Sequence, residues 1–400
     1  MTTDELRSEF PQLSETVYGK PLVYLDNAAT ALRPQSVIDC WNELSSHKNA
    51  NIHRAVHHIA YLATEEYEKA RDAVKDFIGA ANREEIIFTS GTTHSINLVA
   101  FSFGEAFVNA GDEILVDEES HHSNIVPWQM MCERKGAVVR HFNVNQDIAA
   151  LLTPKTRLVA LSHISNVLGI VNPVREIVDI CHTAGVPVLV DGAQGIVHEN
   201  VNVCELGCDF YAFSGHKIYA ATGTGVLYGR REYLDRMPPY MGGGEMIGSV
   251  KWEGTDYAPL PQKFEAGTQN LTGAPTLVPA IEMVRRMRCP EIEKEQRAIV
   301  SFLSERLRAI PGVKIYGLPE DLSKKIPLFS IVAEGAHHED IALILDKMGI
   351  AVRSGQMCAE PLMDSNGVTG MLRVSFGPYN TLAEAEYFVT CLEKALKMLR

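Results

Sequence analysis

The stretch FSGHKIYAATGTGVLYG, residues 213 to 229, holds the side chains with the clearest chemical potential. Lys217 follows a short apolar run, close to Ser214 and His216. If this run is a strand of a parallel sheet, the three residues lie at its carboxyl end, where ligands bind in such sheets. An amine is a nucleophile only when uncharged, and burial near other polar or cationic groups lowers the pKa of a lysine toward neutrality. Lys217 is therefore a candidate Schiff-base lysine, with an ordinary loop lysine as the alternative.

An acidic residue ends the most continuously apolar run, VPVLVDGAQ. The carboxylate of Asp191 is costly to bury without a partner, and a protonated pyridine nitrogen would keep it ionised. The alternative is a helix N-cap, since an acid before a helix of small residues is a common cap. Gln194 adds a side-chain donor near the same strand end.

The stretch FTSGTTHSINLVA joins an apolar run to a helical pattern through Ser90, Gly91, Thr92 and Thr93. Backbone N–H groups at a helix start, with hydroxyls beside them, form a binding site for a phosphate dianion. Capping of the helix by these residues is the alternative explanation.

Two histidines, His121 and His122, follow a further run in ESHHSNIVPW. A histidine here could lay its ring against an aromatic cofactor. We expect no zinc site, because no further ligands at recognised spacing accompany the pair.

A thiol and a guanidinium stand out nearer the C-terminus. Cys358 lies in the loop-like stretch AVRSGQMCAEPLM, where it could act as a nucleophile, and a half-buried structural cysteine is the alternative. Arg373 lies inside the apolar stretch LRVSFG and needs an anionic partner, for which a substrate carboxylate has suitable geometry.

The elements that must position these side chains form an α/β pattern. Helical stretches, such as 93 to 108 and 173 to 184, the second opened by Pro173, alternate with short apolar runs. This alternation predicts a seven-stranded, mostly parallel sheet between helices, with ligands at the carboxyl ends of its strands. The seven runs are 85 to 89, 113 to 117, 137 to 142, 157 to 162, 186 to 191, 209 to 214 and 225 to 229.

Beyond residue 275 the pattern changes to that of a smaller α+β domain. We expect a long helix over 276 to 309, strands in VKIYG, IPLFSIVA, AVR and LRVSFG, a helix over 338 to 348 and a last helix at the C-terminus. The Gly- and Pro-rich stretch 238 to 275 is predicted to be a loop on the active-site side. The expected organisation is an N-terminal segment (1–20) near the small domain, a large domain (21–275) and a small domain (276–400) carrying the Cys358 loop.

Charge and composition restrict the partners. Thirty-seven Lys and Arg against fifty Asp and Glu give 37 − 50 = −13, which opposes binding to nucleic acid or to an anionic membrane. No apolar run approaches the roughly 20 residues that span a bilayer, and the acidic start MTTDELRSEF is unlike a secretory signal, so we expect a cytoplasmic protein. The eight cysteines contain no C-x-x-C, which argues against a disulfide framework or a zinc knuckle.

Taken in order, these stretches resemble the motifs of the class V aminotransferase-like, fold-type I pyridoxal-phosphate enzymes, and more narrowly those of group II (SUF-type) cysteine desulfurases. The resemblance runs from about residue 10 to the C-terminus, and the joint occurrence of the motifs is far more specific than any one of them. The motifs are YLDNAATALRP, SGTTHSINLVA, HHSNIVPW, SHISNVLG, VLVDGAQ, FSGHKIYAATGTGVLYG, FEAGTQN and RSGQMCAEPLM.

The resemblance implies a role for each matching residue. Lys217 would bind pyridoxal 5′-phosphate covalently, His121 would stack on its ring, Asp191 would pair with the ring nitrogen and Gln194 with the phenolic oxygen. The phosphate would be held by Thr92, Thr93, Ser214 and His216, and by Thr268 contributed from the other subunit. The substrate would be bound by Asn166, Arg373, Arg353 and His53, and Cys358 would accept its sulfur.

The activity implied is conversion of L-cysteine to L-alanine, leaving a persulfide on Cys358. Sulfur would then pass to an acceptor protein for iron–sulfur cluster assembly, and the enzyme would be a homodimer with shared active sites. Relatives often have histidines at the positions of Gln356 and Met357, so imidazole assistance to Cys358 would come from His53 or His57. The alternatives are a selenocysteine lyase acting on L-selenocysteine, another class V enzyme such as an aminotransferase or kynureninase-like hydrolase, and a non-catalytic scaffold.

Overall fold

The computed structural model describes residues 1–400, which form two compact units. The large unit comprises Ser36–His163 and Pro173–Ile281. The small unit comprises Met1–Gln35, Ile164–Asn172 and Glu282–Arg400. The short segment 164–172 thus groups with residues that follow it by more than a hundred positions.

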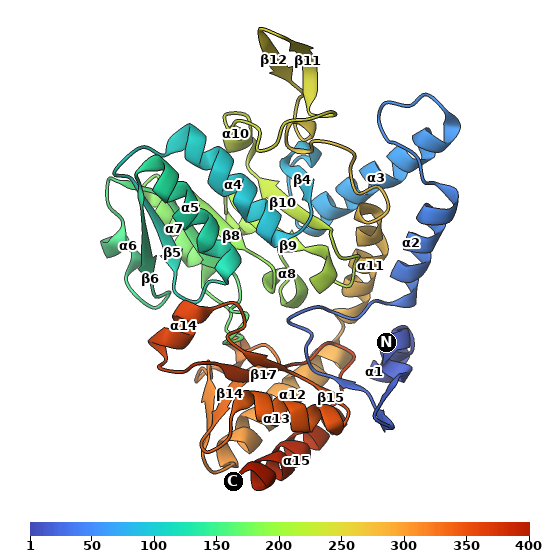
Figure 1. Ribbon diagram of the computed structural model, residues 1–400, viewed down its shortest axis with the longest axis vertical. Helices are drawn as coiled ribbons and strands as arrows, with labels where there is room; N and C mark the ends of the chain where they lie inside the picture. The colour runs from blue at the N-terminus through green and yellow to red at the C-terminus, as the bar shows by residue number, and fades with distance from the viewer. The chain divides into compact units, whose positions relative to one another are not determined.

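The large unit contains the predicted seven-stranded sheet, whose strand order is β4-β10-β9-β8-β7-β5-β6 (Figure 1). Strand β10 is antiparallel to both β4 and β9, and the pairs among β9, β8, β7, β5 and β6 are parallel. The prediction of a mostly parallel sheet is confirmed. The strands are β4 (Ile86–Thr89), β5 (Glu113–Asp117), β6 (Val138–Phe142), β7 (Thr156–Ser162), β8 (Val188–Asp191), β9 (Phe210–Ser214) and β10 (Gly225–Gly229).

Helices cover this sheet because its central strands carry apolar residues on both faces. Helix α4 (Thr92–Phe107) contacts β9 and β10, α5 (Val126–Lys135) contacts β6, and α7 (Val174–Thr183) contacts β8. The buried residues of α4 and α5 join those of the strands in one core that includes Ile87, Val99 and Trp128. Pro173, expected inside the first turn of a helix, is instead the N-cap of α7.

The Gly- and Pro-rich stretch 238 to 275 is not all loop. It contains an antiparallel hairpin of β11 (Ile247–Lys251) and β12 (Gly254–Tyr257), which extends away from the sheet in Figure 1. Three of its apolar side chains, Val250, Trp252 and Tyr257, are exposed. The prediction missed the hairpin because its strands bury no regular apolar face, which is the signal that identifies a strand in sequence.

The small unit is built on a four-stranded antiparallel sheet of order β13-β14-β17-β16. Its strands are β13 (Val313–Tyr316), β14 (Leu328–Ala333), β16 (Arg353–Gly355) and β17 (Met371–Ser375), and its main helices are α12 (Pro290–Ala309), α13 (His338–Lys347) and α15 (Leu382–Leu399). Two further strands, β3 (Val23–Tyr24) and β15 (Ile350–Ala351), pair in parallel.

The long helix expected over 276 to 309 is two helices, α11 (Leu277–Met287) and α12. Pro290 is the first residue of α12, and proline cannot continue a preceding helix because it lacks the N–H and its ring clashes with the turn before it. The single-helix prediction was therefore wrong at this point.

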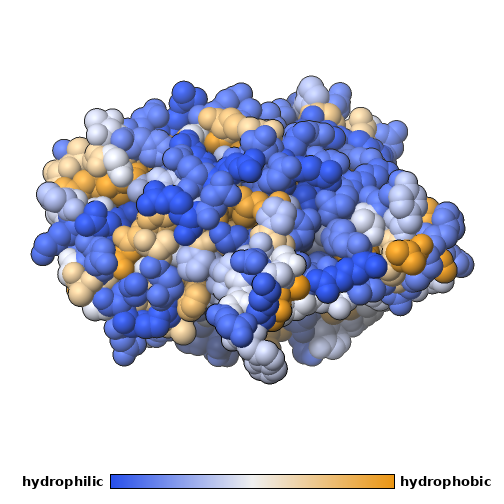
Figure 2. All heavy atoms as spheres, turned by 90° about the horizontal axis from the view of Figure 1, so that it is seen from above, coloured by the Kyte–Doolittle hydropathy of each residue, from blue (hydrophilic) through white to orange (hydrophobic).

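The remaining helices and strands lie outside the two main sheets. They are α1 (Thr3–Ser8), β1 (Thr16–Val17), β2 (Lys20–Pro21), α2 (Gln35–His47), α3 (His58–Phe77), α6 (Ile148–Leu151), α8 (Gly195–His198), α9 (Val203–Leu206), α10 (Arg231–Leu234) and α14 (Glu360–Ser365). The surface in Figure 2 is mainly hydrophilic, with hydrophobic residues in separate patches. None of the helices combines the length and apolar composition that crossing a membrane requires.

Candidate active site

Four neighbouring strands of the large unit end in polar residues. Asp117, Ser162, Asp191 and Ser214 are the last residues of β5, β7, β8 and β9, and all four are buried. Because these strands are parallel, their carboxyl ends share one edge of the sheet. Two hydrogen bonds connect neighbouring strand ends at this edge. Ser162 N donates to Asp117 Oδ2, and His163 N donates to Asp191 O at a distance of 2.9 Å.

Lys217 lies within electrostatic range of Asp191 at this edge. Lys217 ends a short 3-10 helix, Gly215–Lys217, directly after β9, and it is half-buried, as is His216. Burial raises the pKa of Asp191, while the Lys217 ammonium and a hydrogen bond from Ala193 N act to lower it. The arrangement brings together an amine and a carboxylate that needs a cationic partner.

Gln194 is buried in the turn after Asp191. The side chains of His163 and Tyr211 pack closely against the two glycines of this turn. A Cβ on Gly192 would come within 2.0 Å of the Tyr211 ring, and one on Gly195 within 2.3 Å of His163 Nδ1. The His163 imidazole and the Tyr211 hydroxyl form a hydrogen bond of 2.9 Å. Burial lowers the pKa of His163 to about 4, so the ring is neutral near pH 7.

The start of α4 is joined to the end of β9. Thr92 N donates to Ser214 Oγ at 2.8 Å, and the two side-chain hydroxyls lie 2.7 Å apart. A Cβ on Gly225 would lie 2.3 Å from Gly91 Cα, so only glycine allows β10 to approach this closely. The structure therefore gathers two predicted phosphate ligands, Thr92 and Ser214, at the N-terminus of a long helix.

Thr93, the other predicted phosphate ligand of this helix, is exposed and contacts the segment that carries His121. Its hydroxyl lies 2.7 Å from Ser123 Oγ, while Ser123 N donates to His121 Nδ1 at 3.0 Å. The histidine and the helix start are thus connected through one serine.

Asp117 holds the turn that leads to His121, a role that was not predicted from the sequence. Its carboxylate accepts from Glu119 N at 2.7 Å and from Ser120 Oγ at 3.0 Å, besides Ser162 N. Burial raises its pKa to about 6, against the lowering effect of these bonds. The available signal was that Asp117, like Asp191, is an acid at the end of an apolar run.

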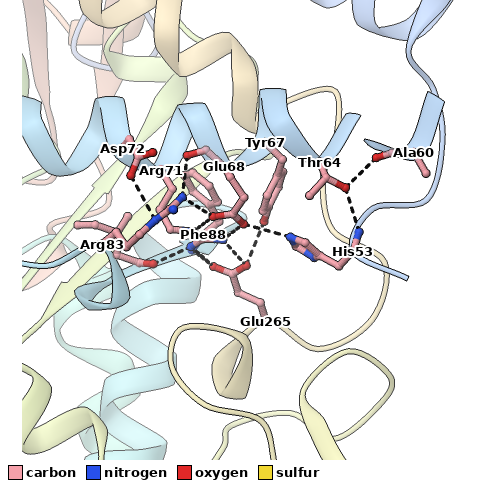
Figure 3. A network of polar contacts seen from close by, with 11 residues as sticks. His53, Ala60, Thr64, Tyr67, Glu68, Arg71, Asp72, Arg83, Phe88 and Glu265 are labelled. Atoms are coloured by element: carbon pink, nitrogen blue, oxygen red, sulfur yellow. Dashed lines mark hydrogen bonds and ion pairs between the residues drawn. The ribbon is translucent and has the colours of Figure 1, made fainter. Parts of the chain in front are cut away.

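Thr268 is exposed and lies in a loop. A buried ion pair, that of Arg71 with Glu265, anchors the start of this loop (Figure 3). Glu265, three residues before Thr268, accepts two bonds from Arg71, at 2.7 and 2.9 Å, and one from Phe88 N at 2.7 Å. Both charged side chains are almost fully buried, 0% and 2% exposed. The network fixes one end of the Thr268 loop to α3 and β4.

His53 belongs to the same network, because its Nε2 lies 3.1 Å from Glu68 Oε1 (Figure 3). Glu68 also binds Arg71 and Arg83. The second histidine suggested as an aid to Cys358, His57, accepts from Ala60 N at the start of α3.

In the small unit, Arg373 on β17 lies at the centre of a second cluster. Its Nη1 donates to Asn166 O at 2.9 Å and its Nη2 to Asp26 Oδ1 at 3.0 Å. Arg353 on β16 pairs with Arg373 in the strand register. Burial lowers the pKa of Arg373, and Asp26 and the half-buried Cys358 lie close enough to act in the opposite direction.

Asp26 lies in the motif YLDNAATALRP, and nothing in the sequence around it predicted the contact with Arg373. Arg373 retains a buried Nε without a hydrogen-bond partner, at a guanidinium that is otherwise bonded within the unit. Such an N–H is a natural donor to an anionic ligand.

The residues of the large unit fit pyridoxal phosphate. Asp191 is a carboxylate whose pKa is raised by burial, and a protonated ring nitrogen beside it would favour its ionised form. Lys217 offers the amine for a covalent link, and the N-terminus of α4 with Thr92 and Ser214 offers donors for a phosphate dianion.

Comparisons with known proteins agree with this geometry. The class-V aminotransferase family profile matches residues 23–388. A probable cysteine desulfurase of Vibrio cholerae is 44% identical over 406 aligned positions, covering all of both chains, and a cysteine desulfurase of Cronobacter sakazakii is 44% identical, covering 99% of this chain and 98% of its own.

Two solved structures are similar over the whole chain. The cysteine desulfurase CsdA of Escherichia coli, in an S-sulfonic acid form, has a TM-score of 0.91 and 37% identity, with full coverage of both chains. The apo cysteine desulfurase of Thermococcus onnurineus NA1 has a TM-score of 0.93 and 37% identity, covering 100% of this chain and 99% of its own. The chain therefore belongs to the class-V aminotransferase family of pyridoxal-phosphate enzymes, among relatives that are cysteine desulfurases.

Proposed function

We propose that this protein is a cysteine desulfurase that uses pyridoxal phosphate and receives the substrate's sulfur on Cys358. The observation that carries the proposal is the cluster in the small unit, where the buried guanidinium of Arg373 lies within electrostatic range of the Cys358 thiol and is bonded to Asn166. A carboxylate-binding cation beside a half-buried thiol suits a substrate with both a carboxylate and a sulfur atom.

When bound, pyridoxal phosphate would supply an electron-accepting ring that stabilises negative charge at the substrate Cα. The roles proposed for the chain's own residues are those that the family resemblance implies. Asp191 would hold a proton on the ring nitrogen, and Gln194 would donate to the phenolic oxygen. His121 would cover one face of the ring, while Thr92, Thr93, Ser214 and His216 would hold the phosphate.

Lys217 would bind the cofactor's aldehyde carbon and, once displaced by the substrate amine, would take the proton from Cα. Arg373 and Asn166, with Arg353 and His53 at the substrate site, would fix the carboxylate. The Cys358 thiolate would then attack the substrate Sγ, so that the Cβ–Sγ bond breaks and an S–S bond forms. Protonation of Cβ completes L-alanine, so L-cysteine plus one thiol gives L-alanine plus one persulfide.

The finer features of the proposal are a group II (SUF-type) enzyme that works in the cytoplasm as a homodimer, and transfer of the persulfide sulfur to an acceptor protein for iron–sulfur cluster assembly. The exposure of Thr268 supports the proposed dimer, in which that hydroxyl reaches the cofactor phosphate of the partner. The half-exposure of Cys358 supports delivery to a second protein.

The test compares Cys358→Ser with Cys204→Ser, which removes an exposed thiol in the large unit. Purified proteins are given L-cysteine and a thiol reductant, and alanine and sulfide are measured. We expect Cys358→Ser to lose more than about 99% of both products while keeping its cofactor absorbance, and Cys204→Ser to match the parent. Full activity in Cys358→Ser, or amino transfer to a 2-oxo acid that is unaffected by it, would reject the proposal.

A further inference from the structure

Cys358 lies in a tight turn whose backbone is in a rare conformation. Met357 and Cys358 have φ angles of +53° and +57°, and Ala359 N donates to Gln356 O at 3.0 Å. A four-residue turn with this bond and two positive φ angles is of type I′, which strongly favours Gly, Asn and Asp at the two central positions. Met and Cys stand there instead, so other contacts must hold the turn in place.

The side-chain amide of Asn166 supplies one of those contacts. Its Nδ2 donates to Met357 O at 2.9 Å, which is the carbonyl of the peptide that joins Met357 to Cys358. Asn166 is 8% exposed, so water competes little for this bond. The Met357 side chain is buried in an apolar cluster with Val167, the residue after Asn166. Backbone and side chain of residue 357 are thus held from the same short segment.

That segment is itself fixed within the small unit. Ser165 N donates to Ile170 O at 3.1 Å, which closes the loop, and Ser330 Oγ donates to Val167 O at 2.6 Å. The main-chain oxygen of Asn166 accepts from Arg373 Nη1. One residue therefore contacts the nucleophile's turn through its side chain and the guanidinium through its backbone.

We propose that Asn166 is a positioning residue for the nucleophile, which through Met357 O fixes the direction of the Cys358 thiol and keeps it at a set spacing from Arg373. This inference rests on the proposed function and goes beyond carboxylate binding by Asn166. A substrate with three bonds between its carboxylate carbon and its sulfur presents these two groups at a limited range of distances, so a fixed spacing of thiol and guanidinium favours attack on Sγ.

The test measures thiol reactivity in the cofactor-free protein, where substrate binding plays no part. Iodoacetamide is added, and alkylation of Cys358 is followed by peptide mass spectrometry relative to exposed Cys204 in the same molecules. The variants are Asn166→Ala, and Asn166→Gln, which keeps an amide but displaces it. The matched control is Ser330→Ala, which loosens the same segment without touching the amide.

We expect the Cys358-to-Cys204 alkylation ratio to rise about threefold or more in both Asn166 variants, because the released turn exposes the thiol, and to stay within about 1.5-fold of the parent in Ser330→Ala. In the loaded enzyme, single-turnover sulfur transfer to Cys358 should fall about tenfold in Asn166→Ala. An unchanged ratio in either folded Asn166 variant, or an equal rise in Ser330→Ala, overturns the inference. Failure of the parent to form a persulfide on Cys358 would instead overturn the proposed function, whatever the ratio.

Discussion

Arg373 donates a hydrogen bond of 3.0 Å to Asp26, a residue 347 positions away in the chain. The arginine side chain is 3% exposed and the aspartate side chain 22%. A buried cation needs an anion, and here the protein supplies one before any substrate binds. Asp26 therefore stabilises the buried guanidinium of Arg373. The Nε of Arg373 has no hydrogen-bond partner and remains available to a ligand.

Replacing Asp26 by Asn should destabilise the small unit, because the Arg373 charge then has only neutral acceptors. We expect a loss of about 2 kcal/mol in the free energy of unfolding, measured by urea denaturation. Asp364→Asn, at an exposed position of the same unit, should stay within about 0.5 kcal/mol of the parent. Equal stability of all three proteins would show that the pair contributes nothing.

The buried pair of Arg71 and Glu265 gives a larger expected effect (Figure 3). Glu265→Gln keeps the shape of the side chain but removes the buried carboxylate of the pair and leaves the guanidinium with Glu68 alone, so we expect a loss of about 3 kcal/mol. Glu105→Gln, which removes an exposed ion pair with Arg134, should cost less than about 1 kcal/mol. Thermal or urea unfolding of both variants measures the difference, and equal losses would contradict it.

His163 should make stability depend on pH. Its folded-state pKa of about 4 lies below the ordinary value of 6.5, so the unfolded chain binds the proton first as the pH falls. The stabilisation is complete above pH 6.5 and is lost as the pH falls toward 4. Relative to His163→Asn, which does not titrate here, the parent should lose about 2 to 3 kcal/mol between pH 7 and pH 4.5.

The control for this titration is Tyr211→Phe, which removes the hydrogen bond to His163 and leaves the imidazole in place. Its pH dependence should follow that of the parent. A stability difference between the parent and His163→Asn that stays constant with pH would contradict a buried, neutral ring.

Gly225 should control cofactor affinity, although no role in chemistry is assigned to it. A Cβ at this position would force the backbone of Gly91 away from a distance of 2.3 Å and so displace the start of α4. We expect Gly225→Ala to weaken pyridoxal-phosphate binding about tenfold or more, as measured by absorbance titration. Gly254→Ala, in the hairpin with open space around it, should bind the cofactor as the parent does.

Much of the large unit could be predicted because its strands are continuous apolar runs, and a fully buried parallel sheet requires such runs. Asp191 and Ser214 are among the polar residues that end these runs. They lie at one edge because the carboxyl ends of parallel strands meet there. The hairpin of β11 and β12 was missed because it lacks an apolar face, and the break before Pro290 because charged residues continue the helical pattern on both sides.

The supporting contacts of the site were much harder to predict. Asp26 reaches Arg373, and Asn166 reaches Met357, only because the chain returns to the small unit after long excursions. Sequence spacing carries no signal for such contacts when no local periodicity links the partners. The buried pair of Arg71 and Glu265 could not be predicted either, because the same residue types form ion pairs on the surface and in the core.

The most direct measurement gives the pure, cofactor-loaded enzyme L-cysteine labelled with a heavy sulfur isotope, without reductant, and then alkylates and digests it. The prediction is that one labelled sulfur atom is found on the peptide containing Cys358, in an amount equal to the alanine formed, and none on that containing Cys204. Alanine formed with no labelled sulfur on Cys358 would contradict the account at its centre.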